Sequence, residues 1–147
     1  MIEWALTVTN TIEFRDRDLA QLSGGQRQRV WLAMALAQET NILLLDEPTT
    51  YLDMAHQLEV LEIVKSLNEE HRCTIVMVLH DINHAARYSD HLIAMRQGVV
   101  MKTGAPQEIL CVDVMRQVFN IDARIMEDPV TKTPVCYGYD VLKEVQQ

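Results

Sequence analysis

The spacing of hydrophobic residues along the chain predicts three helices. Apolar residues recur every three or four positions, as on one face of a helix, from residue 2 to about 9, after Ser23, and from residue 54 to about 70. The second helix is predicted to present an apolar surface made by Val30, Trp31, Met34, Leu36 and Ala37. The third is predicted to face the core with Met54, Leu58, Leu61, Val64 and Leu67.

Two shorter runs are dominated by apolar residues, at 42–45 and 74–79. Uninterrupted runs of this length are typical of strands buried on both faces of a parallel sheet. The helix between them predicts a right-handed crossover and therefore an α/β fold. Further on, residues 92–95 and 99–102 predict a hairpin. Short helices follow near Pro106 and Val114, and short strands and turns from residue 123 to 139.

Composition and charge narrow the classes of function. The chain has 147 residues, a formal charge of −8 and 48% hydrophobic residues, which predicts one domain at most with enough apolar content for a core. The acidic balance argues against a nucleic-acid surface. No apolar run approaches the roughly 18 residues of a membrane span, and the first residues lack the basic region of a signal peptide. Three widely spaced cysteines favour a reducing, cytosolic setting.

The start of the second helix has the residues of a phosphate site. Ser23 and Gln26 fit a capping box, in which each side chain bonds to the other residue's backbone. Gly24 and Gly25 lie in the first turn, where each glycine costs roughly 1 kcal/mol relative to alanine. They make sense if another group must approach the backbone closely. Free N–H groups and the positive dipole end of a helix suit a phosphate; the alternative is an ordinary capped helix.

Charged residues follow both predicted strands. Asp46 and Glu47 come directly after the first run, and His80 follows the second. Open α/β sheets bind their ligands at the carboxyl ends of strands. A carboxylate there can hold Mg²⁺, and its neighbour can deprotonate a water. The alternatives are a capping Asp-Glu pair and a core or capping histidine. Asp53 is expected to cap the third helix.

The sequences LSGGQ at 22–26 and ILLLDEP at 42–48 strongly resemble the signature motif and Walker B strand of ABC-type ATPases. The resemblance covers nearly the whole chain as the C-terminal half of that domain: 1–21 as a remnant of the helical subdomain, 22–91 from the signature motif to the switch histidine, and 92–147 as C-terminal hairpin, helices and tail. DEPTTYLDMAHQ and the segment from GAPQEIL onward resemble ATPase subunits that drive uptake of iron–siderophore and other metal-chelate complexes.

The resemblance implies roles for these residues. It implies ATP and Mg²⁺ as ligands, with Asp46 at the magnesium site, Glu47 as general base and His80 as the switch histidine that contacts the terminal phosphate. In a head-to-tail dimer with a second ABC ATPase subunit, Asp53 belongs to the D-loop, and the signature residues that contact phosphate across the dimer are Ser23, Gly24, Gly25 and Gln26. Membrane permease subunits are the other implied partners, on the cytoplasmic face of the cell membrane.

One family motif is absent from these 147 residues. No glycine precedes a Lys and a Ser or Thr in the pattern GxxxxGK[ST], whose backbone and lysine bind the phosphates. We therefore expect a partial P-loop NTPase-like domain without its phosphate-loop half, inactive on its own. Two other classes stay open. One is a non-catalytic interaction fragment that lends its signature motif or dimer surface to a complete partner. The other is a DNA-repair or chromosome-organising ATPase, although the long heptads that would support it are missing.

Overall fold

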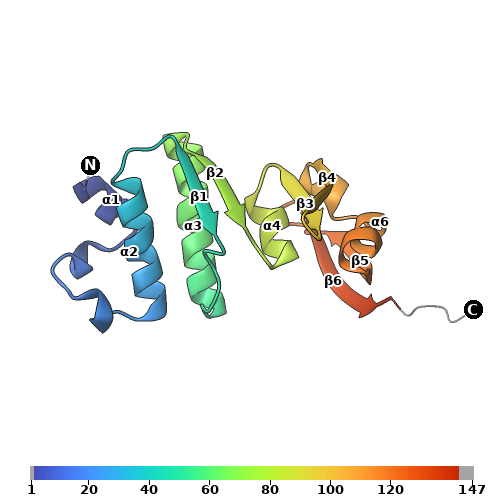
Figure 1. Cartoon of the computed structure of the whole chain (residues 1–147), viewed down its shortest axis with the longest axis horizontal. Coiled ribbons are helices and arrows are strands. Elements are labelled where there is room, and N and C mark those ends of the chain that lie inside the picture. The colour runs from blue at the N-terminus through green and yellow to red at the C-terminus, as the bar shows by residue number, and fades with distance from the viewer. Residues whose placement is uncertain (1, 143–147) are drawn as a thin grey trace, which may run out of the picture. The chain divides into compact units, whose positions relative to one another are not determined.

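The structure of the chain, a computed structural model, describes residues 2–142. The chain divides into two compact units, Met1–Leu79 and His80–Gln147 (Figure 1). The predicted segment 22–91 therefore contributes residues to both units. Its boundaries, like those of segments 1–21 and 92–147, stay predictions.

Helices and one parallel strand pair form the first unit (Figure 1). Its elements are α1 (Ile2–Val8), η1 (Ile12–Phe14), η2 (Leu19–Gln21), α2 (Gly24–Leu36), β1 (Ile42–Asp46), α3 (Met54–His71) and β2 (Thr74–Val78). β1 and β2 pair in parallel, from Ile42 opposite Thr74 to Asp46 opposite Val78. The predicted helices, the two strands and their parallel pairing are confirmed.

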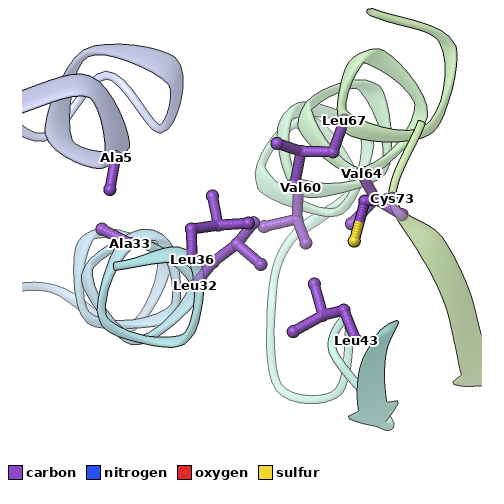
Figure 2. Packing of buried hydrophobic residues seen from close by; sticks show 9 residues of the cluster. All are labelled: Ala5, Leu32, Ala33, Leu36, Leu43, Val60, Val64, Leu67 and Cys73. Carbon is purple, nitrogen blue, oxygen red and sulfur yellow. The ribbon is translucent and has the colours of Figure 1, made fainter. Parts of the chain in front are cut away.

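The core of the first unit lies between α1, α2, α3 and β1. Ala5 faces Ala33, and Leu32 and Leu36 point toward Val60, with Leu43 of β1 nearby (Figure 2). Leu61 and Leu67 are fully buried, and burial of one such side chain stabilises a fold by about 1.5–3 kcal/mol. The predicted stripe on α3 is confirmed from Leu61 to Leu67, whereas Met54 is 75% exposed at the start of the helix.

The predicted apolar surface of α2 is partly wrong. Leu32, Ala33 and Leu36 face the core, while Trp31 and Met34 are 54% and 56% exposed. The alanines of α2 left the direction of its core face ambiguous in the sequence. Small alanines allow α1 to approach α2 closely, as the facing pair Ala5 and Ala33 shows (Figure 2).

The prediction that β1 is buried on both faces is also wrong for the part of the chain that the structure describes. Leu43 is buried, but its neighbours Ile42 and Leu44 are 59% and 74% exposed. On β2, Val76 and Val78 are about half exposed. Successive side chains of a strand point to opposite faces, so one face of this two-stranded sheet is packed and the other is apolar and open. Within residues 2–142, β1 pairs only with β2.

Antiparallel strands and short helices form the second unit (Figure 1). Its elements are α4 (Ile82–Tyr88), β3 (Leu92–Arg96), β4 (Val99–Gly104), α5 (Pro106–Ile109), α6 (Val112–Val114), the π-helical turn η3 (Met115–Phe119), β5 (Ile121–Glu127) and β6 (Pro134–Val141). β3 pairs with β4 and β5 with β6. The predicted hairpin is confirmed, with Gln97 and Gly98 both at positive φ in its turn. The core of the second unit contains Ala94, Ile109, Val114, Met115, Val118, Ala123 and Cys136.

None of the described helices combines the length and the apolar composition that a membrane crossing requires.

Candidate functional site

The start of α2 has the predicted capping box. The Ser23 hydroxyl accepts a hydrogen bond from the Gln26 N–H at 3.3 Å, and the Gln26 side-chain oxygen accepts one from the Ser23 N–H at 2.9 Å. No acidic residue lies in the first turn. This end of the helix therefore keeps the positive character that favours an anion.

The two signature glycines have different surroundings. Gly24 is exposed, and a methyl group added there would have Leu52 Cδ2, at 4.0 Å, as its nearest neighbour. Gly25 is buried, and the same group would lie 2.5 Å from His56 Cδ2. The close approach that the glycine pair predicts is therefore made, at Gly25, by a side chain of α3. Gly24 is the glycine whose surface stays open.

Asp53 caps α3, as expected, and also holds His56. One carboxylate oxygen accepts from the His56 N–H at 3.0 Å and lies 2.7 Å from the His56 ring Nδ1. The bond from the His56 N–H is the main cause that holds the pKa of Asp53 below its usual value, and the bond to the His56 ring adds to it. Asp53 thus stays ionised at the start of α3, next to the start of α2.

The two predicted carboxylates lie at the carboxyl end of β1. Asp46 is the last residue of the strand and is exposed. Glu47 is half-buried and has a left-handed backbone with φ of 49°. That conformation costs a residue with a side chain about 1–2 kcal/mol, and such strain concentrates at functional sites.

A tight turn fixes Glu47 after the strand. The Thr50 hydroxyl donates to its carboxylate at 3.0 Å, and the Thr50 N–H donates to its carbonyl oxygen at 3.2 Å. Tyr51, in the same turn, also has a positive φ, of 63°, and its side chain is fully exposed. The turn thus directs Glu47 by backbone geometry as well as by a hydrogen bond.

His80 begins the second unit, two residues after β2. Within that unit it lines a cavity of about 240 Å³, together with Asp81, Ile82, Asn83, Phe119, Ile121, Cys136 and Tyr139. Asp81 caps α4 by accepting from the N–H groups of Asn83 and His84. The Asn83 amide exchanges two hydrogen bonds with the Cys136 backbone, at 2.8 and 3.0 Å, which attaches α4 to β6.

Comparison with known proteins identifies the family of this chain. The profile of the ABC transporter family matches residues 1–50. The Iron(3+)-hydroxamate import ATP-binding protein FhuC of Bacillus subtilis (strain 168) is 54% identical over the whole chain, which spans 55% of that protein. The chain belongs to the ABC transporter ATPase family. It spans about half the length of the curated relatives it matches.

Solved structures of ABC transporters share the fold. A metal-chelate type ABC transporter in an inward-facing conformation aligns with a TM-score of 0.82 and 26% identity, over 97% of this chain and 56% of that one. A dimeric bacterial ABC transporter cassette aligns with a TM-score of 0.62 and 37% identity, over 71% of this chain and 45% of that one. The α/β fold expected for a partial ABC ATPase domain is confirmed.

Sequence reasoning named eight candidate residues, which stay predictions, but missed the side chains that contact two of them, Glu47 and Asp53. Thr50, which bonds to Glu47, follows a proline and a threonine and looks like an ordinary turn residue. His56, which bonds to Asp53, lies three residues after a predicted N-cap. That spacing is the one signal in the sequence that places its backbone N–H against Asp53.

Proposed function

We propose that the chain forms part of an ATP-hydrolysing subunit of an ABC importer for iron–siderophore complexes. The main support is the Asp46–Glu47 pair at the end of β1, in a chain 54% identical to a protein named for iron(3+)-hydroxamate import. The proposal names a truncated subunit, because the phosphate-binding pattern GxxxxGK[ST] does not occur in the 147 residues.

Glu47 is the proposed general base. A carboxylate that accepts a proton from an attacking water must be held within hydrogen-bond reach of it. The left-handed backbone at Glu47 and the Thr50 hydroxyl restrict where this carboxylate points. His80, two residues after β2, is the proposed contact to the terminal phosphate.

Asp46 is the proposed magnesium-site residue. Mg²⁺ prefers oxygen ligands and is commonly held by one or two carboxylates together with waters and phosphate oxygens. The exposed carboxylate of Asp46 at a strand end fits that donor chemistry. Bound Mg²⁺ would neutralise charge on the phosphates of ATP.

The start of α2 is the proposed contact to the phosphates of an ATP held mainly by a second ATPase subunit. Ser23 and Gly24 are exposed there. The Ser23 hydroxyl accepts from Gln26 and can still donate its own proton. Gly25 and Gln26 shape this surface, since Gly25 is covered by His56 and the Gln26 side chain closes the capping box. Asp53 is the proposed D-loop contact in the same head-to-tail dimer. ATP hydrolysis in this dimer would drive the movement of membrane permease subunits, which the dimer would contact on the cytoplasmic face of the membrane.

A non-catalytic interaction fragment is the second candidate. The specific observation in its favour is the same missing pattern, together with the open apolar face of the β1–β2 sheet. Such a fragment would lend its signature motif or dimer surface to a complete partner and would not hydrolyse ATP in any assembly.

Reconstitution separates the two candidates. The purified 147-residue chain should neither bind ATP at micromolar concentration nor hydrolyse it, because most phosphate contacts of such sites come from the missing loop. The chain joined to a segment of a relative that contains GxxxxGK[ST] should show magnesium-dependent hydrolysis. Turnover by the chain alone would refute the hypothesis that it is a truncated subunit. A joined protein that folds but does not hydrolyse ATP would favour the interaction fragment. Uptake of radiolabelled iron(3+)-hydroxamate into vesicles that contain a hydroxamate permease would test the cargo.

A further inference from the structure

The inference concerns His56, a residue of α3 that lies against the backbone of the signature helix. A Cβ atom built on Gly25 would meet three atoms of His56: Cδ2 at 2.5 Å, Cγ at 2.9 Å and Cβ at 3.3 Å. Two of these atoms, Cβ and Cγ, do not move when the ring turns about the Cβ–Cγ bond. Ring rotation therefore cannot make room, and Gly25 must lack a side chain as long as His56 keeps its position.

The position of His56 is itself fixed by the cap of α3. Asp53 Oδ1 accepts from the His56 N–H at 3.0 Å and lies 2.7 Å from the ring Nδ1. Rotation about the Cα–Cβ bond would carry the ring away from Gly25 but would break this second bond. One carboxylate thus orders both the first turn of α3 and the side chain that contacts α2.

These contacts connect three sequence motifs. The signature glycine Gly25 lies against the helix residue His56, and His56 is held by the D-loop residue Asp53. Gly24 lies outside this chain of contacts, because its nearest neighbour, Leu52, is at ordinary van der Waals distance. The structure therefore divides the glycine pair into one residue required by packing and one that leaves its backbone open.

We infer that His56 is a positioning residue, which fixes the start of α2 against the start of α3 so that Gly24 and Asp53 are presented together. The inference rests on the proposed function for its consequence in catalysis. Small displacements of positioned groups lower the rate of the chemical step more than they change substrate binding. Loss of His56 should therefore affect kcat more than KM.

Thermal unfolding of the 147-residue chain tests the contact without any activity. Gly25→Ala should lower Tm by about 5 °C, because an added methyl group is overpacked. In a His56→Ala background the same change should cost much less, because Cδ2 and Cγ are gone and only Cβ, at 3.3 Å, remains. Gly24→Ala is the matched control for stability and should leave Tm unchanged or raise it by up to about 3 °C, because alanine is the better helix former and meets no close neighbour there. An equal loss of Tm from Gly25→Ala in both backgrounds would overturn the inference.

Steady-state kinetics of the joined, nucleotide-competent protein tests the consequence. His56→Ala should lower kcat about 10-fold with KM for ATP within about twofold. His56→Asn retains Cβ, Cγ and a side-chain donor for Asp53, and should restore kcat to near the parent value. Equal kcat for the Ala and Asn variants, or a loss confined to KM, would refute the positioning role. If the parent shows no turnover that depends on Glu47, the proposed function fails, and the Tm comparison still decides whether His56 positions the two helices.

Discussion

The carboxyl end of β1 and the start of α2 hold their functional residues in opposite ways. After β1, Glu47 and Tyr51 both occupy left-handed backbone conformations that disfavour side chains. At the start of α2, Ser23 and Gln26 form a capping box, and Gly25 packs under His56. The first region stores strain, whereas the second is held by a helix cap and by packing against a neighbouring helix.

The difference predicts how each region responds to substitution. Residues in the strained turn can be replaced with little loss of stability, or even with a gain, while the proposed chemistry suffers. Residues of the capped helix start contribute to the fold itself, so their substitution should lower stability as well as activity. Measurements of turnover and of unfolding on the same variants would separate the two behaviours.

Glu47→Gln should have the largest effect on activity. In the joined, nucleotide-competent protein, turnover should fall by roughly 100-fold or more, since the amide cannot act as a general base. ATP binding and Tm should stay close to those of the parent, because glutamine keeps the size of the side chain and an acceptor for Thr50. Glu70→Gln, at an exposed position near the end of α3, is the control and should change neither quantity. Turnover that survives Glu47→Gln would remove Glu47 from the role of base.

Ser23→Ala should mainly reduce stability. Loss of a serine N-cap costs about 1 kcal/mol, which lowers Tm by about 3 °C in a chain of this size. Ser66→Ala is a suitable control within α3, where the hydroxyl bonds to the Ile63 carbonyl of its own helix and alanine is the better helix former. Differential scanning calorimetry would detect the difference. Equal behaviour of the two variants would mean that the capping box does not stabilise α2 in solution.

Tyr51→Gly should raise Tm by about 1–3 °C, because glycine accepts a left-handed backbone without strain. Arg72→Gly makes the same exchange at the left-handed C-cap of α3, outside the candidate site. Both variants should become more stable. Only Tyr51→Gly should also alter turnover of the joined protein, by loosening the turn that holds Glu47. A lower Tm for Tyr51→Gly would show that this turn is not strained.

Asp53→Asn should change how stability depends on pH. Hydrogen bonds from His56 hold the pKa of Asp53 below its usual value of about 3.9. This ionised carboxylate therefore stabilises the fold above about pH 4, and the contribution is lost as pH falls through the lowered pKa. The Tm difference between parent and variant should shrink as pH is lowered from about 5 toward 2.

Asp128 offers the matching case in the second unit. Its pKa is lowered mainly by the Thr131 N–H and next by the Val130 N–H, so Asp128→Asn should show the same trend. A Tm difference that is constant with pH for Asp53→Asn alone would mean that its bonds to His56 do not persist in solution.

Local sequence signals predicted much of the fold and of the candidate site. The capping box depends on two residues three positions apart, and the hairpin turn on a Gln-Gly pair, so both could be inferred from neighbouring residues. The Asp46–Glu47 pair was placed by the end of an apolar run. Each of these features depends on short-range geometry that the order of residues determines.

Features that depend on packing between distant segments could not be predicted. Exposure of Ile42 and Leu44 depends on what covers each face of the sheet, which periodicity within one strand does not reveal. The different surroundings of Gly24 and Gly25 depend on His56, about 30 residues away in the chain. The left-handed backbone of Glu47 has no signature in its residue type, because glutamate seldom adopts it.

The open face of the β1–β2 sheet makes the solution behaviour of the chain depend on ionic strength. Ile42, Leu44, Val76 and Val78 form an apolar surface beside an edge strand, a combination that favours pairing between molecules. The net charge of −8 opposes such encounters by mutual repulsion. Salt shortens the range of that repulsion from about 30 Å at 0.01 M to about 8 Å at 0.15 M but leaves the hydrophobic attraction intact. The chain should therefore sediment as smaller species in dilute buffer than at physiological salt, and Leu44→Lys should remove the difference.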